Sequence, residues 1–171
     1  MPTKPVPERV RWLVELLAPR PDARVLEVGG GPGVAAQLIC ERLGGGRMTL
    51  VDRSATALRQ SGHRNAKHLM SGRLELVESG LAEFRPQPGA YDLAFSINVN
   101  VFWAATAERE LAVLREALVP GGRLAIAYGA ALPGRDAEGV LDAVAERMER
   151  AGFSAIRPVR SGAGSAVLAE R

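Results

Sequence analysis

The chain has too little of several residue types for some classes of protein. Cys40 is the one cysteine among 171 residues, which excludes an intrachain disulfide and argues against a metal site built from thiolates. No apolar stretch approaches the roughly 18 residues that a membrane-spanning helix needs. Residues 1–5 lack the apolar core of a signal peptide. We therefore expect a cytoplasmic protein that does not engage a membrane.

Lysine is also scarce, since 20 of the 22 basic residues are arginine. These arginines are scattered among 19 acidic residues, and the formal net charge is only +3. A surface that binds nucleic acid usually shows as a basic stripe, and the linear sequence has none. No nucleic-acid partner is expected.

Segments with strand character alternate with helical segments along the chain, which favours a parallel sheet with helices on both faces. The expected strands are 24–28, 47–51, 74–77, 91–97 and 123–128, and the expected helices are 7–17, 34–43, 54–70, 106–118 and 137–151. Two last strands, 153–159 and 166–169, are joined by six residues. Because that connection is too short for a crossover helix, these strands must form an antiparallel hairpin.

A run of glycines follows the first expected strand. Residues 25–33 read Val-Leu-Glu-Val-Gly-Gly-Gly-Pro-Gly, and glycines at 29, 31 and 33 let the backbone approach a bound nucleotide because no Cβ intervenes. Nineteen residues after Gly33, the second strand ends in Asp52, about where such folds place the acid for the ribose hydroxyls. Glu27, just before the glycines, would repel a phosphate but suits a cofactor with cationic groups.

This run and four later stretches resemble, in the same order, the motifs of class I S-adenosylmethionine-dependent methyltransferases. The stretches are the acid-and-glycine run 27–33, the second strand 49–52, the fourth strand 91–96, the Leu-x-Pro-Gly-Gly segment 118–124 and the closing hairpin. The resemblance covers about residues 20–171. It implies a Rossmann-like, doubly wound α/β fold, with a seven-stranded, mostly parallel sheet and a C-terminal antiparallel hairpin. It also implies S-adenosylmethionine as cofactor and methyl transfer to a small-molecule acceptor by in-line displacement.

By this resemblance, the whole of 1–171 is one methyltransferase domain. Residues 21–171 form its core, and residues 1–20 form an N-terminal helix that could act as a lid. No lid inserted after the fifth strand is expected, since only about eight residues separate that strand from the last helix. The acceptor would be covered by this N-terminal helix, by residues 98–106, by a second subunit or by the bulk of a large acceptor. Trp12 and Leu16 lie off the apolar stripe of the first helix, so they could serve a lid or the contact of a homodimer.

The resemblance also assigns the cofactor-binding residues. Glu27 would lie near the methionine ammonium, and Asp52 would accept both ribose hydroxyls. Arg53 would cover one face of the adenine. The remaining cofactor residues are Gly29, Gly30, Gly31, Gly33, Gly80, Leu81 and Asn98. Two alternatives stay open: Glu27 could be a strand residue paired with Arg24, and Asp52 could cap the following helix.

The adenine end departs from the family pattern. Ser79-Gly80-Leu81 stands where such families usually have Gly-Asp-Ala, with Glu78 and Glu83 on either side, so the usual aspartate is missing or shifted. The Leu81 N–H or the carboxylate of Glu78 could hold the adenine instead.

We expect the residues that contact the methyl acceptor to follow the fourth strand, because the carboxyl ends of parallel strands line the ligand crevice. Asn98 and Asn100 should face it. Phe102 and Trp103 could wall off the acceptor, or could be core packing. Tyr128 is a weak candidate for a base.

No catalytic acid or base and no metal ligand is assigned. His63 and His68 lie on the polar 54–70 helix, where we expect them to be solvated. Two other functions remain as alternatives: a non-catalytic S-adenosylmethionine-binding or scaffold protein, and an NAD(P)-dependent oxidoreductase, which Glu27 disfavours.

Overall fold

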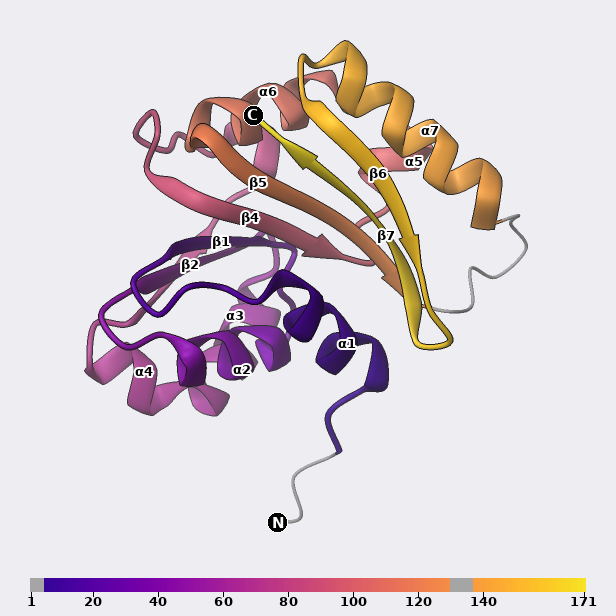
Figure 1. Ribbon diagram of the computed structural model, residues 1–171. Helices are drawn as coiled ribbons and strands as arrows, with labels where there is room; N and C mark the ends of the chain where they lie inside the picture. Colours follow the sequence, from indigo (N-terminus) through magenta and orange to yellow (C-terminus); the bar gives the residue numbers. More distant parts are fainter. Residues whose placement is uncertain (1–4, 130–136) are drawn as a thin grey trace.

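A computed structural model describes residues 5–129 and 137–171 of the protein. Its sheet has seven strands in the order β3-β2-β1-β4-β5-β7-β6 (Figure 1). The strands are β1 (Arg24–Val28), β2 (Arg47–Asp52), β3 (Leu74–Glu78), β4 (Tyr91–Ile97), β5 (Leu118–Gly129), β6 (Ser154–Arg160) and β7 (Gly164–Glu170). The first five pair in parallel, whereas β7 is antiparallel to both β5 and β6. The Rossmann-like fold with a C-terminal antiparallel hairpin is therefore confirmed.

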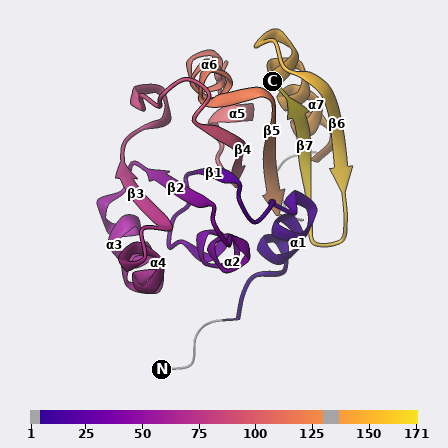
Figure 2. The same ribbon diagram turned by 60° about the vertical axis from the view of Figure 1, so that its left-hand side comes forward.

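Helices cover both faces of this sheet (Figure 2). They are α1 (Glu8–Leu17), α2 (Val34–Arg42), α3 (Ala55–Arg64), α4 (Ala66–Met70), α5 (Val101–Ala104), α6 (Glu108–Ala117) and α7 (Ala137–Arg150), with a 3-10 turn η1 at Leu81–Glu83. The core has two clusters of buried side chains, one per face. Helices α1 and α2 contribute to one cluster, and helices α6 and α7 contribute to the other. Residues 1–4 and 130–136 lie outside the described residues, and 130–136 include the connection where no inserted lid is expected.

The expected 54–70 helix is wrong as a single element, because it breaks at Asn65 into α3 and α4. Ser54 caps α3 as predicted, by accepting a hydrogen bond from Ala57 N. Asn65 is fully buried and donates to Gly33 O at 3.0 Å. His68 is also buried, so the expectation that it is solvated is wrong. Asn65 and His68 thus point into the protein, and Asn65 packs against the glycine turn. The hydrophobic periodicity of a helix does not predict the burial of polar side chains.

The segment after β4 also differs from the prediction. Residues 101–104 form the short helix α5, which the sequence did not indicate. The predicted cap Thr106 is wrong, because α6 begins after Ala107, which is buried and left-handed with φ 55°. This rearrangement decides where the candidate acceptor residues point.

Candidate functional site

The glycine turn after β1 is built from left-handed residues. Gly29, Gly31 and Gly33 have φ values of 67°, 53° and 72°, a region that side chains with a Cβ rarely adopt. Gly29 N donates to Val51 O at 2.8 Å, which ties the turn to the end of β2. Gly30 has no space for a side chain, since a Cβ there would lie 2.6 Å from Leu50. The backbone therefore turns sharply at the carboxyl end of β1, as predicted.

A cavity of about 560 Å³ opens beside this turn. Its wall comes from the carboxyl ends of β1, β2 and β4, from the segment after β3, and from α5 and α6. The lining residues are Val28, Gly29, Val51, Asp52, Arg53, Ser79, Gly80, Leu81, Ala82, Glu83, Asn98, Val99, Asn100, Val101 and Glu110. Most of the predicted cofactor residues thus come together here, while Glu27, Gly30, Gly31 and Gly33 belong to the strand and turn beside the wall.

Glu27 lies buried next to the glycine turn, with 2% of its surface exposed. Its Oε2 has no hydrogen-bond partner among the described residues. Burial, and then the charge of Asp52, raise the pKa of this carboxyl to about 8. The alternative pairing with Arg24 is wrong, because Arg24 instead forms a two-pronged ion pair with Asp92 at 3.0 and 3.1 Å. The carboxyl of Glu27 therefore has an oxygen that no described residue satisfies.

Asp52 uses both carboxylate oxygens to hold the backbone around the cavity. Oδ2 accepts from Gly31 N and Oδ1 from Ser54 N, each at 2.9 Å. The alternative of a contact at the helix start is partly confirmed: Ser54 is the N-cap of α3, and Asp52 Oδ1 holds the N–H of that cap residue. Each carboxylate oxygen has a second lone pair, so Asp52 can still accept hydrogen bonds from a ligand in the cavity that it lines.

The adenine end contains an acid that the sequence analysis did not select. Glu83 reaches back from η1 over Gly80, where any Cβ would collide with its carboxylate, and it lines the cavity. Glu78 is exposed and is not part of the wall. The suggestion that Glu78 replaces the missing aspartate therefore has no support in the geometry. Glu110, in the first turn of α6, is a second acid on the wall that was missed.

The predicted acceptor residues divide into two groups. Asn98 and Asn100 are exposed and line the cavity, as expected. Asn98 has φ 58°, and its Oδ1 accepts from Gly129 N at 2.9 Å, which joins the ends of β4 and β5.

The aromatic residues of the prediction are elsewhere. Phe102 is fully buried in the core because α5 turns it inward, and Trp103 packs against the same cluster. Tyr128 is 1% exposed and donates to Val99 O at 3.2 Å. Burial raises the pKa of Tyr128. None of the three lines the cavity. The alternative that Phe102 and Trp103 are packing residues is therefore confirmed, and the buried hydroxyl of Tyr128 has no place on the cavity wall as a base.

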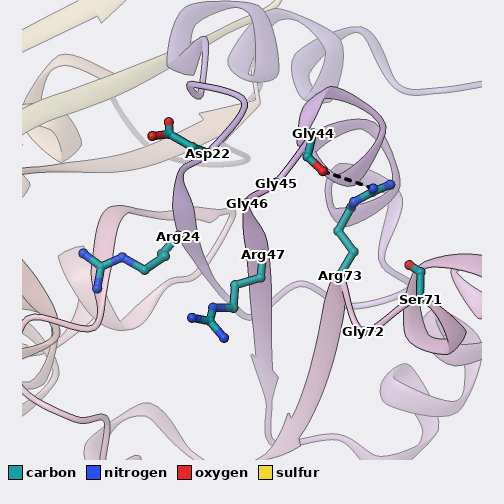
Figure 3. Close-up of a pocket in the computed structure, with 9 residues that line it drawn as sticks. All are labelled: Asp22, Arg24, Gly44, Gly45, Gly46, Arg47, Ser71, Gly72 and Arg73. Carbon is teal, nitrogen blue, oxygen red and sulfur yellow. Dashed lines mark hydrogen bonds between the residues drawn. The ribbon is translucent and has the colours of Figure 1, made fainter.

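A second cavity, of about 460 Å³, lies at the opposite, amino edge of the sheet (Figure 3). Arg24, Arg47 and Arg73 are among its lining residues. Arg24 is already paired with Asp92, and Arg73 Nη2 donates to a backbone carbonyl. The N–H groups of residues 44–46 all donate to one carbonyl, that of Pro21. With these donors occupied, the loop has no free backbone cradle for a phosphate, so the functional site is the cavity at the carboxyl edge.

The described residues show neither a metal cluster nor a membrane-spanning helix. No group of three or more histidine, cysteine, aspartate or glutamate side chains could hold a metal ion there. None of the described helices is long and apolar enough to cross a membrane.

Known proteins resemble the chain in both sequence and fold. A trans-aconitate 2-methyltransferase from Paracidovorax citrulli is 37% identical over 123 residues, 70% of this chain and 45% of the relative. A protein-L-isoaspartate O-methyltransferase from Aeropyrum pernix is 31% identical over 124 residues, 72% of this chain and 45% of the relative. The chain thus spans about half the length of the curated relatives it matches.

Among solved structures, a SAM-dependent methyltransferase from Aquifex aeolicus has a TM-score of 0.77 at 20% identity, covering 96% of this chain and 90% of that one. The [4+2]-cyclase SpnF has a TM-score of 0.75 at 16% identity, covering 96% and 80%. These two matches establish the fold alone, because one fold can support different chemistry. A model of the methyltransferase domain matches residues 25–122, more than half of the chain. The protein therefore belongs to the methyltransferase domain family.

Proposed function

We propose that the protein transfers a methyl group from S-adenosylmethionine to a small carboxylic acid. The observation that carries this proposal is the buried, unpartnered carboxyl of Glu27 beside a glycine turn and a cavity of about 560 Å³. Family membership supports S-adenosylmethionine as the cofactor. The relatives named trans-aconitate 2-methyltransferases support a small carboxylic acid as the acceptor.

The residues present fit this cofactor. Glu27, with a pKa of about 8 in the free protein, would be stabilised in its charged form by the methionine ammonium, and its Oε2 has no competing partner among the described residues. Asp52 lines the cavity with oxygens that can accept the ribose hydroxyls. Leu81 offers a buried apolar surface and Glu83 an acceptor at the adenine end. A dinucleotide fits less well, because Glu27 would repel its pyrophosphate beside the turn.

The chemistry requires little of the chain beyond positioning. When bound, the cofactor supplies a methyl carbon made electrophilic by a positively charged sulfur. A carboxylate acceptor is already ionised near neutral pH, so no side chain has to remove a proton from it. This agrees with the absence of histidine from the described residues of the cavity wall. Asn98 and Asn100 can orient the acceptor, and most of the rate would come from holding the two reactants together.

We further propose that the activity is cytoplasmic and that residues 1–171 work as one domain. The continuous seven-stranded sheet, with one core cluster on each face, supports the single domain.

Calorimetry and a transfer assay test the function. We expect binding of S-adenosylmethionine and S-adenosylhomocysteine but not of NADH. With methyl-labelled cofactor, label should appear in the methyl ester of trans-aconitate or a related polycarboxylic acid. Binding of NADH without binding of S-adenosylmethionine would overturn the proposal, as would cofactor binding without transfer to any carboxylic acid.

The variant Asp52→Ala tests the ribose assignment. Losing hydrogen bonds to a charged acceptor typically costs about 1.5–3 kcal/mol, so the affinity for S-adenosylmethionine should fall more than about tenfold. Asp142→Ala, at an exposed position on α7, is the control and should bind normally. Asp52 also holds the Gly31 and Ser54 N–H groups, so thermal unfolding must show that the variant is folded. An unchanged affinity in a folded variant would refute the assignment.

A further inference from the structure

The first turn of α1 reaches the same edge of the sheet as the cofactor cavity. The helix runs antiparallel to β5, because Leu17 O near its end accepts a hydrogen bond from Arg123 Nη2 at 2.9 Å. Arg9, near its start, lies against Gly129 at the end of β5. Figures 1 and 2 both show α1 beside the arrowhead of β5. Arg9 therefore lies at the carboxyl edge of the sheet, on helix α1, whose apolar face is buried in the core.

Two facing glycines make room for this helix. Gly129 and Gly164 are paired across β5 and β7. A Cβ at Gly129 would lie 3.1 Å from Arg9 Cδ, and a Cβ at Gly164 would lie 3.2 Å from Trp12 Cζ3. Arg9 and Trp12 are three residues apart and so share a face of α1. The aliphatic part of the Arg9 side chain thus packs directly against Gly129, where a larger residue would crowd it.

The charged part of Arg9 has no partner in the described chain. Its Nε is buried, and no described residue accepts a hydrogen bond from it or forms an ion pair with the guanidinium. Leaving a buried donor of a charged group unsatisfied is costly. A ligand oxygen would remove that cost.

Asn98 relates Arg9 to the cavity: Arg9 is not itself a lining residue, but both side chains lie against Gly129. Arg9 Nε and Asn98 Oδ1 both lie 3.9 Å from the point that a Cβ of Gly129 would occupy. Asn98 is part of the cavity wall. Its Oδ1 accepts from Gly129 N, which leaves the amide NH2 group free to donate on the other side.

The charges on the wall make the position of Arg9 significant. Among the described residues, the wall carries three acids, Asp52, Glu83 and Glu110, and one cationic side chain, Arg53. An anionic acceptor would be repelled by this wall on its own. Arg53 follows β2, at the end assigned to the cofactor, whereas Arg9 is a described cationic side chain that shares Gly129 with Asn98.

We propose that Arg9 binds a carboxylate group of the acceptor other than the one that is methylated. This rests on the proposed function, and it narrows the acceptor to molecules with at least two carboxylates. The planar guanidinium suits a carboxylate because it can donate two parallel hydrogen bonds. Arg9 then acts as the residue that selects di- and tricarboxylic acids over monocarboxylic acids.

The test compares Arg9→Gln and Arg9→Lys with Arg11→Gln. Arg11 is an exposed residue of the same helix, and its replacement removes the same charge. For a di- or tricarboxylic acceptor, Arg9→Gln should lower kcat/KM at least about tenfold, chiefly through KM, while the affinity for S-adenosylmethionine stays the same. Arg9→Lys should retain part of the activity, and Arg11→Gln should match the original protein. The original protein should prefer polycarboxylic over monocarboxylic acceptors, and Arg9→Gln should lose that preference. An equal loss for both acceptor types, or no loss, would overturn the assignment.

A binding experiment separates this proposal from the proposed function. With S-adenosylhomocysteine bound, propane-1,2,3-tricarboxylate is titrated into the original protein and Arg9→Gln, so that no methyl transfer is required. Binding that is lost in Arg9→Gln and kept in Arg11→Gln supports the role of Arg9, even if no carboxylic acid is methylated. Absence of binding to the original protein, or equal binding to Arg9→Gln, overturns it.

Discussion

Replacing Glu27 with glutamine should stabilise the free protein and weaken its binding of the cofactor. The side chain is 2% exposed, and its Oε2 is unpartnered within the described residues. Burial, followed by the charge of Asp52, raises the pKa of the carboxyl from 4.5 to about 8. Because the carboxyl ionises more easily in the unfolded chain than in the folded protein, it lowers the free energy of unfolding above pH 4.5. A neutral glutamine at this position should therefore raise the free energy of unfolding.

The sign and size of the effect follow from that pKa. Below about pH 4.5 the carboxyl is neutral in both the folded and the unfolded chain. Between pH 4.5 and about 8 only the unfolded chain releases the proton, so the free energy of unfolding falls as the pH rises. At roughly 1.4 kcal/mol per pH unit, the full loss is on the order of 4–5 kcal/mol, and roughly 3 kcal/mol of it is present at pH 7. For a chain of this size that corresponds to a difference in Tm of several degrees.

Thermal unfolding across pH 4.5 to 9 measures the first half of this prediction. Glu27→Gln should have the higher Tm at pH 8, and the difference should shrink toward pH 4.5. Calorimetric titration at pH 8 measures the second half, and S-adenosylmethionine should bind at least about tenfold more weakly because its ammonium loses a charged partner. Glu75→Gln, an exposed acid on β3, should change neither quantity. A variant with the same pH dependence as the original protein, or with undiminished affinity, would refute the reasoning.

Two further predictions concern the packing of the turn and the amino edge of the sheet. Gly30→Ala places a Cβ 2.6 Å from Leu50, which is fully buried, and should destabilise the protein by about 1–3 kcal/mol in denaturant unfolding. Gly45→Ala, where nothing lies within 4 Å, is the control, and an equal effect of both variants would argue against a steric cause. Asp92→Asn should cost about 1.5–3 kcal/mol at pH 7, because it breaks the ion pair with Arg24. The hydrogen bond from Arg24 holds the pKa of Asp92 below its ordinary 3.8, so this stabilisation is lost as the pH falls through the lowered pKa. A stability gap of the same size at pH 7 and pH 2 would contradict it.

The strands could be predicted closely from the sequence because each is a short apolar run with glycine, proline or charge at its ends. The predicted bounds of β1 and β4 agree with the structure, and the short connection correctly required an antiparallel hairpin. One group of errors lies where polar side chains are buried. Asn65 and His68 look solvated in a helical pattern, yet Asn65 is turned inward by its hydrogen bond to the glycine turn.

The site could be predicted where a residue's place is fixed by the backbone. Asp52 ends β2 beside the glycine turn, and Asn98 follows β4, so both had to lie at the carboxyl edge. Phe102 and Tyr128 also lie near that edge, but their direction depends on α5 and on the pleat of β5, which bury both. Glu83 was missed because its role depends on η1 folding back over Gly80.

The position of α1 bears on how the acceptor is covered. Val10, Leu13, Val14 and Leu17 are all buried against the sheet and α2. At about 1.5–3 kcal/mol for each such side chain, lifting the whole helix would cost on the order of 6–12 kcal/mol, comparable with the entire stability of a typical domain. A lid that opens by moving all of α1 is therefore too costly to operate in each catalytic cycle. The helix instead holds Arg9 in place before the acceptor arrives, so little side-chain freedom is lost on binding. Selectivity for polycarboxylic acids would then come from a preformed contact rather than from closure.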